Sequence, residues 1–164
     1  MTARTNLAAL PNERTVEITR IFDAPRSLVF KMWTDPKHMA QWWGPKRFTN
    51  PVCEVDARVG GKILIHMRGP DGVVYPMTGT FREVVAPERL VFMAVAEDHD
   101  GNRLLESLTT VTFEEHGDKT KLTVHASAVG LASIAPQMLA GMEMGWTQSL
   151  EKLEELVERG GRKA

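Results

Sequence analysis

The sequence predicts an α+β domain in which a curved antiparallel sheet of seven strands surrounds one long C-terminal helix, with two short helices after the first strand. From residue 60 to 93, apolar and polar side chains alternate with a period of two, which is typical of consecutive hairpins. Near the C-terminus, apolar residues recur at helical spacing and form one stripe: Met138, Met142, Trp146, Leu150, Leu153 and Val157. A sheet curved around one helix tends to leave a cavity between them.

The first strand is expected at 14–22, where side chains on opposite faces alternate. Asp23 is a suitable helix cap and Pro25 suits a first helical turn, so a short helix is expected to follow and to end before Pro36. A second short helix is expected at 37–43. Together the two helices would brace the sheet.

Six further strands are expected between these helices and the C-terminal helix. The turns between several of them contain Asp-Gly or Gly-Asp pairs, which tolerate tight reversals. Gly60-Gly61 lacks the spacing of a phosphate-binding loop, so it is interpreted as a tight reversal or bulge. The strands are expected at 52–58, 61–68, 73–85, 89–97, 105–115 and 119–127.

The final helix is expected at 136–158, with Pro136 in its first turn and Gly160-Gly161 as its stop. Gly141 and Gly145 lie inside it, and each costs about 1 kcal/mol relative to alanine. Such a cost indicates either a close approach of the helix to the sheet or space left for a ligand.

Composition limits the classes of partner. The 164 residues suit one domain, expected at 14–160 after a flexible arm at 1–13. Twenty Lys and Arg nearly balance 21 Asp and Glu, which gives no reason to expect nucleic acid as a partner. The single cysteine excludes an intrachain disulfide. With no secretory signal and no apolar run long enough for a membrane span, a cytoplasmic protein is expected.

Several motifs follow one another in the order of a known family. They are RIFDAPRSLVFKMWTDPKHMAQWWGP, CEVDARVGGKILIHMRGPDG, YPMTGTFREVVAPERLVF, and a GW pair at Trp146 with leucines behind it. Over residues 16–157 the chain resembles the homologues of the heat-shock protein 90 ATPase activator. That family belongs to the START-related, birch-pollen-allergen-like superfamily of helix-grip folds, also called the polyketide cyclase/dehydrase and lipid-transport group.

The resemblance implies a ligand-binding cavity more directly than it implies activation of a chaperone ATPase. Relatives of this fold bind lipids, hormones or polyketides in the cavity, and a few are enzymes. The eukaryotic co-chaperone has an additional N-terminal domain that supplies much of its chaperone contact, and the resemblance covers only the C-terminal type of domain. Many relatives also keep an aromatic residue after the Val-Phe pair at 91–92. Here Met93, Ala94 and Val95 follow, and these smaller or softer groups would enlarge the pocket.

The cavity lining is expected to be apolar and rich in methionine, which adapts to irregular ligands. The alternative is that the same residues pack against one another as ordinary core. Adjacent Trp42 and Trp43 cannot both face the core from one short helix, so one is expected to be exposed, to cover the pocket mouth or to pack under the sheet edge. The expected ligand-binding residues are Trp43, Ile65, Met67, Tyr75, Met77, Phe81, Phe92, Met138, Met142 and Trp146.

No catalytic group, metal site or cofactor is expected. The histidines His38, His66, His99, His116 and His125 lack the spacing of a zinc site. Cys53 is interpreted as a small buried apolar residue. Four acidic residues would reach the cavity only if their strand faces point inward, and a solvated face is the favoured interpretation: Glu54, Asp56, Glu83 and Glu106.

We therefore expect a non-enzymatic protein that binds a small apolar or amphipathic molecule. One alternative is a cyclase- or hydrolase-like enzyme, which needs an inward acid or histidine at the cavity. Another is a co-chaperone or other protein-interaction module, which would favour an exposed apolar patch around Trp42, Trp43 and Phe48. The sequence does not identify the ligand.

Overall fold

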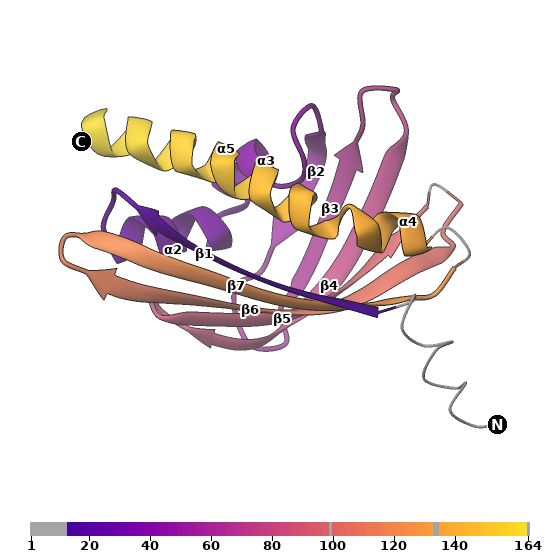
Figure 1. The fold of residues 1–164 in the computed structure, drawn as a ribbon, viewed down its shortest axis with the longest axis horizontal. Coiled ribbons are helices and arrows are strands. Elements are labelled where there is room, and N and C mark those ends of the chain that lie inside the picture. Colours follow the sequence, from indigo (N-terminus) through magenta and orange to yellow (C-terminus); the bar gives the residue numbers. More distant parts are fainter. Residues whose placement is uncertain (1–12, 99, 133–134, 164) are drawn as a thin grey trace.

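Seven antiparallel strands form one curved sheet with the order β1-β7-β6-β5-β4-β3-β2, and a long helix crosses its concave face (Figure 1). The computed structural model describes residues 13–98, 100–132 and 135–163. The arm expected at 1–13 lies outside the described residues, except Glu13, which begins the first strand. The strands are β1 (Glu13–Phe22), β2 (Thr49–Val55), β3 (Lys62–Arg68), β4 (Val74–Val85), β5 (Arg89–Glu97), β6 (Arg103–His116) and β7 (Lys119–Gly130). The predicted fold class is confirmed.

Two short helices, α2 (Arg26–Thr34) and α3 (Pro36–Trp42), lie between β1 and β2 as predicted. The predicted cap of the first is wrong. Pro25 is the N-cap residue of α2, and no side chain caps that end, because Asp23 lies two residues too early. Asp35 instead caps α3, since its carboxylate accepts a hydrogen bond from the backbone N–H of Lys37 at 2.9 Å.

The C-terminal helix differs from the prediction by an internal break and by a later C-terminal end. It consists of α4 (Ala135–Ala140) and α5 (Met142–Lys163), with a break at Gly141. The N–H of Gly141 is shared between the carbonyl oxygens of Gln137 at 3.3 Å and Met138 at 3.2 Å, which marks a locally tightened turn. Gly160-Gly161 does not stop the helix, because glycine weakens a helical backbone without forbidding it.

Gly60-Gly61 forms the predicted tight reversal before β3. Gly60 has a φ of +82°, in the left-handed region that favours glycine. A Cβ on Gly61 would lie 1.9 Å from the backbone oxygen of Asp56, so the chain requires glycine there. Edge strand β2, which precedes this reversal in the sequence, has a register shift between Thr49 and Val52. Pro51 lies at this shift and lacks the backbone N–H that a regular ladder needs.

Trp42 and Trp43 are both buried, with exposed fractions of 0% and 8%, so the expectation that one of them is exposed is wrong. Helix α3 ends at Trp42, and the backbone of Trp43 is extended, with φ −64° and ψ 137°. The two rings therefore leave the chain in directions that a continuous helix would not allow. The indole N–H of Trp42 donates to the carbonyl oxygen of Met32 at 2.9 Å.

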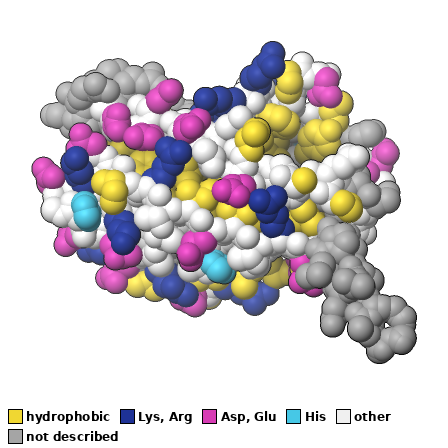
Figure 2. All heavy atoms as spheres, viewed as in Figure 1, with side chains coloured by type: hydrophobic (Ala, Val, Ile, Leu, Met, Phe, Trp, Pro, Cys, Tyr) yellow, Lys and Arg dark blue, Asp and Glu magenta, His cyan; other side chains and the backbone are white. Residues whose placement is uncertain are grey.

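The core lies between the concave face of the sheet and the helices, and includes Trp33, Phe113 and Leu150. Figure 2 shows acidic and basic side chains interspersed over the face seen in Figure 1, as the balanced composition implies. Within the part of the chain that the structure describes, no helix is long and apolar enough to cross a membrane.

Candidate functional site

A cavity of about 250 Å³ lies between the concave face of the sheet and the segment formed by α4 and the start of α5. Its walls come from the loop after α3, from strands β3 to β7, and from both parts of the C-terminal helix. It is the candidate functional site.

Small side chains on both walls explain the cavity. Gly79, Ala94, Ser107 and Ala128 are cross-strand neighbours in one row over β4, β5, β6 and β7. On the helix, Gly141, Gly145 and Ser149 follow one another at four-residue intervals, and all three line the cavity. Because little side-chain volume extends from either surface, the sheet and the helix leave a space that core packing would otherwise fill.

An aromatic cluster forms one wall. The rings of Trp43 and Trp146 line the cavity with their centroids 5.5 Å apart, at an interplanar angle of 80°. Trp33 lies behind them, stacked on Trp146 with centroids 6.0 Å apart. Trp42 contacts Trp33 and Trp43, so all four tryptophans of the chain belong to this cluster. The tryptophan fluorescence of the protein therefore originates in one cluster that borders the cavity.

Seven of the ten residues predicted to bind a ligand line the cavity: Trp43, Met67, Met77, Phe92, Met138, Met142 and Trp146. Ile65 and Phe81 do not, because both are buried among other core side chains. Tyr75 is half-buried near the turn that joins β3 to β4 and does not line the cavity.

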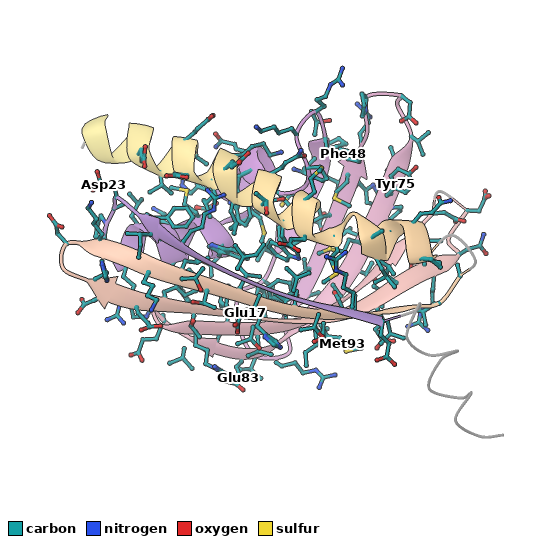
Figure 3. All side chains as sticks on the ribbon, in the orientation of Figure 1. Glu17, Asp23, Phe48, Tyr75, Glu83 and Met93 are labelled. Atoms are coloured by element: carbon teal, nitrogen blue, oxygen red, sulfur yellow. The ribbon has the colours of Figure 1, made fainter. Side chains whose placement is uncertain are left out.

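Sequence reasoning missed most of the small lining residues. The glycines of the C-terminal helix and Ala94 were expected to leave space, and all line the cavity, but Met93 and Val95 do not. Met93 lies on the face of the sheet turned away from α5 (Figure 3). For the missed residues of β6 and β7, the available signal was the run of small side chains at alternate positions of these two strands. The missed residues are Gly44, Pro45, Leu105, Ser107, Thr109, Ala126, Ala128 and Ser149.

None of the described residues that line the cavity is ionisable. The acidic residues considered from the sequence lie elsewhere: Glu83 is 2.9 Å from Arg89, Glu106 is 3.6 Å from Arg103, and Asp56 is 2.9 Å from Arg58. Glu54 is exposed. His125 faces Glu17 at 3.4 Å, and Glu17 lies on the side of the sheet away from α5 (Figure 3).

Cys53 and the remaining candidate ligands do not form a reactive centre. Burial, and then the charge of Glu54, raise the pKa of the Cys53 thiol to about 11, so at neutral pH it is protonated and a poor nucleophile. Across residues 13–98, 100–132 and 135–163, no three His, Cys, Asp or Glu side chains are placed to hold a metal ion.

The loop after α3 is fixed to the helix at one rim of the cavity. The backbone N–H of Lys46 donates to the Gln148 side chain at 3.0 Å, and its ammonium group is 3.0 Å from Glu151. Lys152 donates to the carbonyl oxygen of Pro45 at 3.2 Å, and burial lowers the pKa of Lys152. These contacts hold Pro45 against the cavity.

Arg14 fixes the opposite rim, formed by α4 and its cavity-lining Met138. One guanidinium nitrogen donates to the carbonyl oxygens of Leu139 and Ala140, each at 3.1 Å, and the other is 3.1 Å from Glu143. These carbonyl groups belong to the last turn of α4, where the helix supplies no partner. A cation there is also favoured by the helix dipole. Arg14 thus attaches the short helix to β1.

Replacing Arg14 with glutamine should loosen α4, so that any molecule occupying the cavity leaves it about 3- to 10-fold faster, because one or two net hydrogen bonds that hold α4 are lost. Stopped-flow tryptophan fluorescence with p-xylene as the ligand measures this rate. Arg20→Gln is the matched control, since Arg20 also extends from β1 but pairs with Glu151 and Glu154 of α5. Equal release rates in the two variants would contradict the inference that Arg14 holds α4 over the cavity.

Comparisons with known proteins agree with this architecture. The family model described as activator of Hsp90 ATPase homolog 1-like protein matches residues 23–158. Among curated proteins, none is significantly similar to the chain. A solved structure of an uncharacterized protein from Rhizobium leguminosarum is 26% identical with a TM-score of 0.76, over 90% of this chain and 95% of that one.

Two further solved structures show the same relationship. A protein from Chromobacterium violaceum is 29% identical with a TM-score of 0.75, over 88% of this chain and 96% of that one. The AHSA1 protein from Silicibacter pomeroyi is 25% identical with a TM-score of 0.76, over 90% of this chain and 99% of that one.

Proposed function

The chain belongs to the family of activator of Hsp90 ATPase homolog 1-like proteins, and we propose that its cavity binds a small apolar or amphipathic molecule. The observation that carries the proposal is an apolar space bounded by two tryptophans, Trp43 and Trp146, and by methionines from both the sheet and the helix. Methionine side chains adapt to irregular ligands, and rigid indole rings supply large contact surfaces. Most small-molecule sites have this mixture of a concave apolar surface and few polar groups.

Binding without chemical conversion accounts for the lining better than acid–base catalysis does. A cyclase or hydrolase needs a group that moves protons within hydrogen-bond reach of its substrate. The described residues around the cavity supply two serines and one threonine as their hydroxyl groups, and no acid, histidine, lysine or cysteine. Serine and threonine hydroxyl groups orient ligands more readily than they exchange protons at neutral pH.

A protein-interaction function has less support at the position expected from the sequence. Trp42 and Trp43 are buried, and Phe48 is half-buried, so these residues do not form an exposed apolar patch. Trp43 instead contributes to the cavity wall. The burial of both tryptophans and the cavity beside Trp43 therefore favour binding of a small ligand over docking of a protein.

Titration of the protein with p-xylene tests the proposal. We expect a saturable change of tryptophan fluorescence, because a ligand in the cavity replaces solvent beside Trp43 and Trp146. Native mass spectrometry of freshly purified protein should also detect a co-purified molecule of low mass. A protein that shows no saturable response to p-xylene, by fluorescence or by calorimetry, would contradict the proposed function.

A further inference from the structure

Thr109, at the centre of β6, is a buried residue whose hydroxyl group pairs with no other described residue and is reachable only from the cavity. Three polar or charged residues are buried among those that the structure describes: Thr109, Thr120 and Ser149. The Thr120 hydroxyl donates to the carbonyl oxygen of Ala24 at 2.7 Å, and the Ser149 hydroxyl donates to that of Gly145 at 2.9 Å. Thr109 is only 2% exposed, lines the cavity, and hydrogen-bonds through its side chain to no other described residue.

Ser107 stands beside Thr109 on the same face of β6, because side chains two residues apart share one face of a strand. It also lines the cavity, and its hydroxyl likewise has no partner among the described residues. The two hydroxyl groups therefore form a short polar strip on the cavity floor. Both hydroxyl groups are reachable from the cavity and neither pairs with a described residue, so a ligand atom that hydrogen-bonds to them contributes affinity.

Apolar side chains surround this polar strip. Across the neighbouring strands, Thr109 lies between Phe92 and Ala126, while Ser107 lies between Ala94 and Ala128. Phe92 in turn contacts Trp43, with ring centroids 6.3 Å apart. The strip thus adjoins the aromatic wall, and a ligand that touches both needs a polar atom attached to an apolar body.

Charge and size narrow the ligand class further. No described lining residue carries a charge that could neutralise a carboxylate or an ammonium group, and burying an unpaired charge is strongly unfavourable. The cavity volume of about 250 Å³ lies below the range of about 300–1,000 Å³ that is usual for drug-sized ligands. An uncharged molecule with one ring or a short chain suits this volume.

We propose that the ligand is a small uncharged molecule with a hydroxyl or carbonyl oxygen, and that Ser107 and Thr109 bind this oxygen. The inference rests on the proposed function, because it assigns the polar contacts of the same cavity. It makes the two hydroxyl groups the determinants of specificity, while the tryptophans and methionines supply apolar contact. Phenols, small ketones and alcohols have the required chemistry.

The test compares three para-substituted toluenes that differ in one group: p-cresol, p-xylene and p-toluate. Affinities are measured by calorimetry for the wild type, for the double variant Ser107→Ala/Thr109→Val, and for Thr110→Val. Thr110 is the matched control because it neighbours Thr109 on β6 but points to the opposite face. Valine preserves the shape of threonine and is well tolerated in strands.

We expect the double variant to bind p-cresol about tenfold more weakly, as the loss of one or two hydrogen bonds implies, and to bind p-xylene within about twofold of the wild type. Thr110→Val should leave both affinities unchanged. The wild type should bind charged p-toluate at least about tenfold more weakly than p-cresol. Thr109→Ser, which keeps the hydroxyl, should retain the wild-type affinity for p-cresol.

Different results separate the two proposals. If the wild type binds p-xylene but the double variant loses p-cresol and p-xylene equally, or loses neither, the polar strip is not the recognition element and only the proposed function stands. If the wild type binds neither neutral compound, both proposals are overturned. Should the double variant fail to fold, the single variants Thr109→Val and Thr109→Ser make the same comparison of a lost and a kept hydroxyl.

Discussion

Replacing Trp33 with alanine should lower the free energy of unfolding by about 3–5 kcal/mol, and the same replacement of Trp146 should cost clearly less. The Trp33 side chain is 0% exposed and packs between aromatic rings on several sides, with its centroid 4.6 Å from that of Trp42 and 6.2 Å from that of Phe113. Its removal would leave a large void in a closely packed region.

Trp146 has fewer packing contacts to lose. It is only partly buried, and one side of its ring faces the cavity rather than other side chains. Part of the transfer and cavity penalty is therefore already present in the wild type. Trp33 and Trp146 are otherwise comparable, since both are tryptophans of the same cluster and their rings stack on each other at an interplanar angle of 19°.

Urea unfolding followed by far-ultraviolet circular dichroism measures both variants without relying on tryptophan emission. An equal penalty at Trp146 and Trp33 would mean that Trp146 is ordinary core and that the space beside it closes in solution. That result would remove the physical basis of the ligand cavity, whereas a penalty at Trp146 below about 3 kcal/mol agrees with it.

The fold could be predicted from the sequence because its signals are local and repeated. Alternation with a period of two identified the strands, and the stripe that includes Leu150, Leu153 and Val157 identified the long helix. These three residues are fully buried in the structure. The cap at Asp23 and the stop at Gly160-Gly161 were wrong, because each depends on the backbone path of a few residues rather than on a periodic pattern.

The cavity was less predictable than the fold. Large residues such as Met142 and Trp146 can be assigned to an inner face from spacing alone, but spacing does not say whether that face is filled. The space arises because small residues on four strands happen to form one row, and that row depends on strand register. For the same reason, Ile65 and Phe81 share the inner face but belong to its filled part.

Replacing Met142 with tryptophan should weaken p-xylene binding by about 10- to 100-fold, because the larger ring fills the space between the helix and the sheet. Met142 lines the cavity from the first turn of α5. The variant should remain folded, since it occupies an existing void instead of enlarging a packed region. Calorimetry measures the affinity, and thermal unfolding checks the fold.

Met144→Trp is the matched control, because the same residue type changes two positions later on the same helix. Met144 is 67% exposed and does not line the cavity, so this variant should bind p-xylene as the wild type does. If both variants bound p-xylene with wild-type affinity, the ligand would occupy some other part of the molecule. If both lost binding equally, the change would reflect a general effect on α5. Only a loss confined to Met142→Trp locates the ligand between the helix and the row of small residues.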